Sequence, residues 1–162
     1  MFEQFGEFDS WEEINKAAEG QRNEGDFESL KKLAEENGIT ADDIDKYCDG
    51  QTNTLCTPIT AALGKIDIES AELKPQQIEN DWIEYIQQQI VENDKFALAV
   101  RKKGKSLFEC EGMLLKYAKD HMFKPHEKVL KAAGFTGNVK LGMPGWARER
   151  KIIKEYYLGG KA

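Results

Sequence analysis

The sequence predicts a mainly α protein, a compact molecule of about eight helices in two lobes. Two segments carry a helix-capping pattern, Ser10–Glu13 and Ser106–Glu109, in which serine is followed three residues later by glutamate. Prolines stand where apolar periodicity begins and glycines where it stops, as at helix starts and ends. Between them, apolar residues recur at three- and four-residue spacing, which indicates helices with one buried face.

Four helices are expected in the first part of the chain. Each begins at a residue whose side-chain oxygen can accept a hydrogen bond from the first turn, and each ends at or beside a glycine. They run from Ser10 to Gly20, from Asp26 to Asn37, from Thr40 to Gly50 and from Thr57 to Gly64. The segment 65–75 is expected to be a partly helical connector between an acidic lobe, 1–74, and a basic lobe, 75–162.

Five further helices are expected after this connector. They run from Gln76 to about Glu92, from Phe96 to Arg101, from Ser106 to His121, from Pro125 to Gly134 and from Gly145 to Leu158. Leu115 is among the core candidates of the third of them. The one strand-like piece is Phe135–Met143, where Val139 and Leu141 alternate with polar residues, so at most one short β-hairpin is expected there.

The charge of the chain is divided near Asp94. Residues 1–94 carry 23 acidic and 7 basic side chains, whereas residues 95–162 carry 6 acidic and 16 basic ones. The two parts therefore have net charges of −16 and +10 within a total of −6. Such asymmetry indicates electrostatic partners, with the alternative that the two halves face and neutralise each other.

Several protein classes are disfavoured by composition. No apolar run approaches the length of a membrane span, and the acidic start MFEQFGEFDS lacks the basic region of a secretory signal. The three cysteines, Cys48, Cys56 and Cys110, are odd in number and irregularly spaced. They favour reduced thiols and a cytoplasmic location over a disulfide scaffold.

The sequence offers no clear catalytic or metal-binding constellation. His121 and His126 are separated by Pro125, and no cysteine stands at metal-ligand spacing from them. A calcium loop starting at Asp45 would place Cys56 where a bidentate carboxylate is needed. We therefore expect no metal, no cofactor and no enzymatic activity, and we expect buried structural roles for Cys48 and Cys110.

The segment 102–106 is basic and contains a glycine, but it does not complete a phosphate-binding loop, because Ala99 stands where that loop needs glycine. The start of a helix at Ser106 could nevertheless hold a phosphate of a nucleic-acid backbone. The alternative is that these charges form only a solvated surface.

Two candidate partner-binding faces follow from the charges. The acidic face consists of Glu35, Glu36, Asp42, Asp43, Asp45 and Asp49. The basic face, for a protein partner or nucleic acid, consists of Arg101, Lys102, Lys103, Lys105, Trp146, Arg148, Arg150, Lys151 and Lys154. Trp146 beside two arginines has the composition of a binding hot spot, although it could instead hold the last helix to the core.

The chain also resembles a known family as a whole. The segments FGEFDSWEEINKAAEG, LAEENGI, AVRKKGKSL and LGMPGWARERKIIKEYYLG, spread from about Phe5 to Gly159, resemble the PcfK-like family of small proteins of mobile genetic elements. That family is associated with conjugative plasmids and includes type II-A anti-CRISPR proteins. The resemblance implies an inhibitor that binds the RNA-guided effector nuclease of type II CRISPR systems, and it brings no catalytic residues.

The charge division is compatible with that implication, because such nucleases hold nucleic acid in a positively charged channel. The acidic face would imitate DNA phosphates, while the basic lobe is the candidate for contact with guide RNA or DNA. The alternative function is a conjugation accessory or regulatory protein that binds nucleic acid through its basic lobe.

Overall fold

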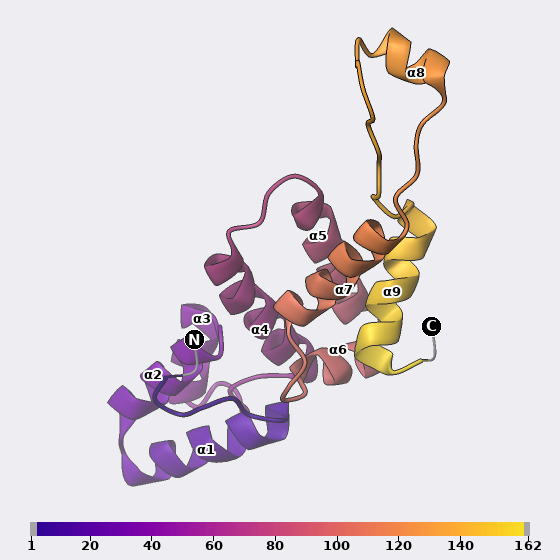
Figure 1. Cartoon of the computed structure of the whole chain (residues 1–162). Coiled ribbons are helices and arrows are strands. Elements are labelled where there is room, and N and C mark those ends of the chain that lie inside the picture. Colours follow the sequence, from indigo (N-terminus) through magenta and orange to yellow (C-terminus); the bar gives the residue numbers. More distant parts are fainter. Residues whose placement is uncertain (1–2, 161–162) are drawn as a thin grey trace.

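A computed structural model of the protein describes residues 3–160 and confirms a mainly α fold, with nine helices and no strand in that range (Figure 1). No helix of this part is long and apolar enough to cross a membrane. The helices are α1 (Trp11–Glu24), α2 (Phe27–Glu36), α3 (Ala41–Cys48), α4 (Pro58–Leu73), α5 (Ile78–Glu92), α6 (Asp94–Arg101), α7 (Leu107–Asp120), α8 (Glu127–Ala132) and α9 (Trp146–Leu158).

Five of the predicted helix starts are confirmed by their hydrogen bonds, whereas α8 begins at Glu127 and not at the predicted Pro125. The Ser10 hydroxyl oxygen accepts from the Glu13 N–H at 3.3 Å, and the Ser106 hydroxyl oxygen accepts from the Glu109 N–H at 3.2 Å. Each bond satisfies one of the N–H groups that the first turn of a helix leaves without an intrahelical partner. Asp26, Thr40 and Thr57 cap α2, α3 and α4 in the same way.

Two predicted helix ends are wrong. Helix α1 continues past Gly20 to Glu24 and stops at Gly25, which has the left-handed φ of 74°. Helix α4 does not stop at Gly64 but continues to Leu73, so most of the expected connector 65–75 is helical. Gly64 is needed for close packing instead, because a Cβ atom there would lie 2.3 Å from the Asn37 carbonyl oxygen.

The buried apolar side chains form two clusters that meet along α4. The first lies among α1, α2, α3 and the start of α4, and the second lies among α4, α5, α6, α7 and α9. Ala61 belongs to the first cluster, whereas Ala62 and Ile66 belong to the second. Helix α4 therefore joins the two cores through consecutive residues. The division into lobes 1–74 and 75–162 stays a prediction.

Buried polar contacts also connect the two ends of this bundle. The Arg101 guanidinium donates to the Asn37 side-chain oxygen at 2.7 Å, joining the end of α6 to the end of α2. The Lys65 ammonium, inside α4, donates to Glu7 at 2.6 Å and to the Lys102 carbonyl at 3.1 Å. Because buried charges are costly without partners, these bonds fix the position of α6 relative to the N-terminal helices.

Residues 121–145 leave the bundle as a projection that we call the arm. Two extended segments carry α8 at the tip, away from the other helices (Figure 1). Phe123 and Leu141 form an isolated antiparallel bridge near the base, with N···O distances of 2.7 and 2.9 Å. Leu141 therefore pairs with Phe123 on the other segment of the arm. The short hairpin considered within 135–143 is not formed.

Candidate functional site

The acidic face lies at the end of the molecule formed by α2 and α3. Asp42, Asp45 and Asp49 are exposed and stand three and four residues apart, so they share one side of α3 and its C-cap. Ile44 and Tyr47 occupy the buried side. At 1.5 Å per residue, the three carboxylates extend over about 10 Å of helix axis.

The carboxylates of the acidic face differ in how far they are engaged within the protein. Asp42 pairs with Lys46 one turn later, and Asp43 accepts a hydrogen bond from the Thr40 hydroxyl at 2.7 Å. Glu36 accepts from the backbone N–H groups of Gln4 and Phe5 at 3.0 and 3.2 Å. Among the six carboxylates of the acidic face, Glu35, Asp45 and Asp49 are exposed and have no such bond.

One residue of the predicted basic face is not on the surface. Arg101 is only 1% exposed and its guanidinium bonds to Asn37, so its assignment to a partner-binding face is wrong. Burial lowers the pKa of this guanidinium, while the nearby carboxylates of Glu7 and Glu69 favour its charged form. Arg101 follows Val100, the last apolar residue of α6, and no local feature of the sequence indicates that the inward face continues through it.

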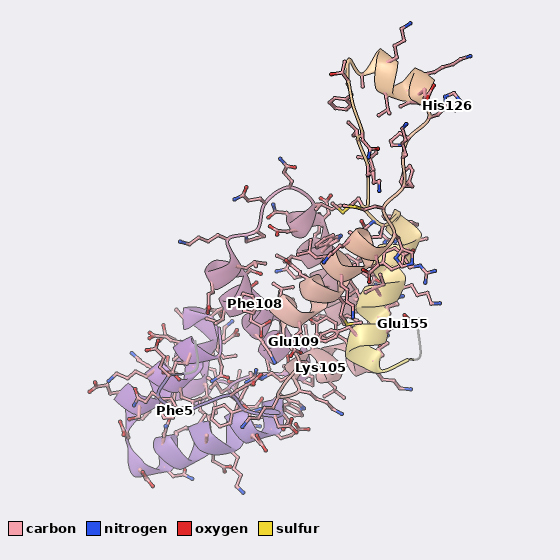
Figure 2. All side chains as sticks on the ribbon, viewed as in Figure 1. Phe5, Lys105, Phe108, Glu109, His126 and Glu155 are labelled. Carbon is pink, nitrogen blue, oxygen red and sulfur yellow. The ribbon has the colours of Figure 1, made fainter. Side chains whose placement is uncertain are left out.

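At the start of α7, protein groups already accept from two of the N–H groups that a phosphate would use. The Ser106 N–H donates to the Tyr156 hydroxyl at 2.7 Å, and the Leu107 N–H donates to the buried Glu69 carboxylate at 2.7 Å. Lys105 is half-buried, because its ammonium donates to the Tyr156 carbonyl at 2.6 Å. Figure 2 shows Lys105 and Glu109 at this end of α7, and phosphate binding there stays a prediction that these contacts disfavour.

Trp146 and Arg150 form an aromatic cluster on the surface of α9. Trp146 is 65% exposed, so the alternative that it holds α9 to the core is wrong. The Arg150 guanidinium carbon lies 3.6 Å from the centroid of the Trp146 ring and 4.7 Å from that of Tyr85. Arg150 is therefore held by cation–π contacts, and one face of Trp146 is covered by it.

The remaining basic residues are exposed on two elements. Lys102 and Lys103 lie on the turn after α6, while Arg148, Lys151 and Lys154 lie on α9. Lys151 pairs with Glu155 at 3.4 Å, and the Arg148 guanidinium carbon lies 5.3 Å from the centroid of the Tyr117 ring. These five residues are the part of the predicted basic face that a partner could reach.

Burial changes the pKa of several titratable groups within residues 3–160. Burial raises the pKa of the Cys56 and Cys110 thiols to about 12, which disfavours the reactive thiolate. Burial and the nearby Glu79 raise the pKa of Glu111 to about 7. Among residues 3–160, no three His, Cys, Asp or Glu side chains come together to hold a metal ion.

The arm carries a basic and apolar surface that the sequence analysis did not select. Its exposed large apolar side chains are Met122, Phe123, Val129, Phe135, Leu141 and Met143. Its exposed lysines are Lys124, Lys128, Lys131 and Lys140. Leu115, expected in the core, is also exposed. The sequence carries a signal for this surface, because the four lysines of residues 121–145 are interspersed with large apolar residues.

Comparisons with protein-family models, with curated proteins and with solved structures give no match to this chain. The resemblance to the PcfK-like family therefore stays a prediction. What is established is the helical fold, the exposed carboxylates of α3 and the basic, apolar arm.

Proposed function

We propose that the protein is a non-enzymatic inhibitor that binds the RNA-guided, DNA-cleaving nuclease of type II CRISPR systems and blocks its engagement of DNA. The observation that carries this proposal is the row of exposed carboxylates Asp42, Asp45 and Asp49 on one side of α3. The resemblance of the sequence to the PcfK-like family supports the same conclusion.

The physical argument is one of charge complementarity. A nuclease of this kind holds the guide–target duplex in a positively charged channel and contacts its backbone. Three carboxylates within about 10 Å of helix present a row of negative charge of the kind that a phosphate backbone presents. Glu35 and the partly engaged Glu36, at the end of α2, add to this charge. Such complementarity accelerates association and selects partners.

Inhibition by binding alone needs no catalytic group in this chain. The Cys56 and Cys110 thiols are buried and have raised pKa values. The carboxylates of the acidic face lie at the surface and not in an apolar pocket of the kind that prepares a carboxyl group for acid–base catalysis.

A purified cleavage assay tests the proposal. The protein is added to several type II-A nucleases loaded with guide RNA, either before or after target DNA. We expect cleavage to be lost when the protein is added first and largely retained when DNA is already bound. If every nuclease cleaves normally in excess protein under both orders of addition, the proposal is wrong.

A second candidate function is a conjugation accessory or regulatory protein that binds nucleic acid through the basic lobe. It is favoured by the exposed side chains of Lys102, Lys103, Arg148, Lys151 and Lys154. Binding through these residues would weaken steeply as salt increases, because phosphate contacts release counterions. Gel-shift titrations of the isolated protein at two salt concentrations test this, and an absence of any shift at low salt would remove the candidate.

A further inference from the structure

The arm is unusual because it exposes apolar and basic side chains together. Within residues 121–145 there are four lysines and one glutamate, Glu127, in a chain whose total charge is −6. Six large apolar side chains of the arm are 50% or more exposed. Figure 2 shows the side chains of the arm projecting away from the bundle, with His126 at the start of α8.

The base of the arm is held by specific contacts, whereas its tip does not pack against the helical bundle (Figure 1). The Phe123–Leu141 bridge ties its two segments together. Gly142 lies directly against α7, since a Cβ atom there would be 2.1 Å from the Ala118 carbonyl oxygen. His121 bonds through its Nδ1 to the Tyr117 carbonyl at 2.9 Å and stacks on the Tyr117 ring. The direction in which the arm leaves the bundle is therefore set by specific contacts.

The tip of the arm has an aromatic and basic hollow. Leu130, which is 8% exposed, is the large apolar side chain that α8 buries there. Phe135 lines the same hollow and is 57% exposed, while Lys124 and Lys131 also line it. Phe123 is 56% exposed further down the arm. Exposed apolar groups along the whole arm indicate an interaction site.

The charges of the arm select an anionic partner. A second copy of this chain is one anionic surface, because α1, α2 and α3 are acidic. That surface would pair with lysines but would not cover aromatic rings, since Phe27 is the large apolar side chain that these three helices expose. Single-stranded nucleic acid offers both kinds of contact, with phosphates for lysines and unpaired base faces for aromatic rings.

We propose that the arm binds single-stranded nucleic acid, with its lysines on backbone phosphates and with Phe123 and Phe135 stacked on unpaired bases. The arm lies at the opposite end of the molecule from α1–α3, so the acidic helices do not obstruct a strand there (Figure 1). The proposal does not rest on nuclease inhibition. It also uses other residues than the basic face of α9 and the turn after α6.

Fluorescence anisotropy of the full chain with labelled oligonucleotides tests the proposal. The probes are a short oligothymidylate, a short oligouridylate and a DNA duplex of the same length, each titrated at two salt concentrations. One variant replaces the four arm lysines by glutamine, at Lys124, Lys128, Lys131 and Lys140. The matched control replaces four exposed lysines of the body by glutamine, at Lys102, Lys103, Lys151 and Lys154.

We expect the wild type to bind both single strands more tightly than duplex. Each lost phosphate contact reduces the slope of log affinity against log salt by about 0.7, so the arm variant should lose a slope of about 3. The body variant should keep most of that slope. Phe123→Ala and Phe135→Ala should each weaken binding about fivefold to a hundredfold, as loss of one stacked base does. All these positions are exposed, so circular dichroism should show unchanged helix content.

Several results would overturn the proposal. It fails if the wild type binds no oligonucleotide at low salt, or if the body variant loses binding while the arm variant keeps it. Tighter binding to duplex than to single strands would contradict base stacking. If the chain dimerises, and Phe123→Ala abolishes dimerisation without changing oligonucleotide binding, a second copy covers the arm. A cleavage assay with the arm variant separates the two proposals, because nuclease inhibition through the carboxylates of α3 does not require the arm lysines.

Discussion

Gly64 and Gly38 determine how closely α4 approaches the turn between α2 and α3. Gly38 has a φ of 68°, and a Cβ atom on it would lie 2.3 Å from the Gly64 carbonyl oxygen. A Cβ atom on Gly64 would in turn lie 2.3 Å from the Asn37 carbonyl oxygen. Both are backbone atoms, so neither clash can be relieved by rotating a side chain.

We therefore expect Gly64→Ala to lower the free energy of unfolding by about 1–3 kcal/mol or more, as overpacking of a core does. Urea denaturation followed by circular dichroism measures this. Gly112→Ala is the control, because Gly112 lies within α7 with nothing close to its Cβ position. That change should raise stability by about 0.5–1 kcal/mol, since alanine favours helix. Equal effects of the two substitutions on the free energy of unfolding would contradict the close approach of Gly64 to the Asn37 carbonyl oxygen.

Glu111 makes stability depend on pH. It is 4% exposed on α7, and burial raises its pKa to about 7 from an ordinary value of 4.5. The native carboxyl therefore retains its proton at pH values where the unfolded one has lost it. The free energy of unfolding should fall as the pH rises from about 4.5 to about 7, and the full cost of about 3 kcal/mol applies above that range.

Glu111→Gln removes this titration while keeping the size of the side chain. We expect the variant to match the wild type near pH 4 and to be more stable by up to about 3 kcal/mol at pH 8. Thermal or urea unfolding across this pH range measures the difference. A difference between variant and wild type that does not change with pH would contradict the assigned pKa.

At the scale of elements, helix starts were predicted better than helix ends. Ser10, Asp26, Thr40, Thr57 and Ser106 all cap helices as expected, because a cap depends on a few neighbouring residues. Glycine is ambiguous, since it ends a helix at one place and permits close packing at another, as Gly64 does.

The candidate site was predictable only where it depends on local spacing. The shared side of Asp42, Asp45 and Asp49 follows from helical periodicity. The burial of Arg101 depends on Asn37, which is 64 residues away, and the projection of the arm depends on how Gly142 crosses α7. Contacts between distant residues of this kind cannot be deduced from neighbouring residues.

Limited proteolysis tests whether the arm is the least protected element. Lys128, Lys131 and Lys140 are exposed and lie outside the packed bundle, whereas Lys124 precedes Pro125. We expect the first tryptic cuts at these three lysines, identified by mass spectrometry. The two products should remain together in gel filtration, because α9 packs against α6 and α7. First cuts within α1–α3 or α9 would contradict this arrangement.

The whole molecule separates its charges in space. The acidic helices α1–α3 lie at one end, and the arm lies at the other (Figure 1). The alternative that the two halves face and neutralise each other therefore does not hold for these two parts. Two opposite ends of opposite charge allow the protein to contact a positively charged protein surface and a nucleic acid at different places.

Association kinetics test most directly whether the carboxylates of α3 bind the nuclease. The variant replaces Asp42, Asp45 and Asp49 by asparagine and leaves Asp43 in place, because Asp43 bonds to the Thr40 hydroxyl. The control replaces Lys151 and Lys154 by glutamate, which leaves the Arg150–Trp146 contact intact.

Surface plasmon resonance on an immobilised nuclease–guide RNA complex should show that the asparagine variant associates several-fold more slowly than the wild type. Its dissociation rate should change little, and the difference should shrink as salt screens the charges. The glutamate variant should bind as the wild type does. If the asparagine variant instead associates normally and the glutamate variant does not bind, the carboxylates of α3 are not the contact surface.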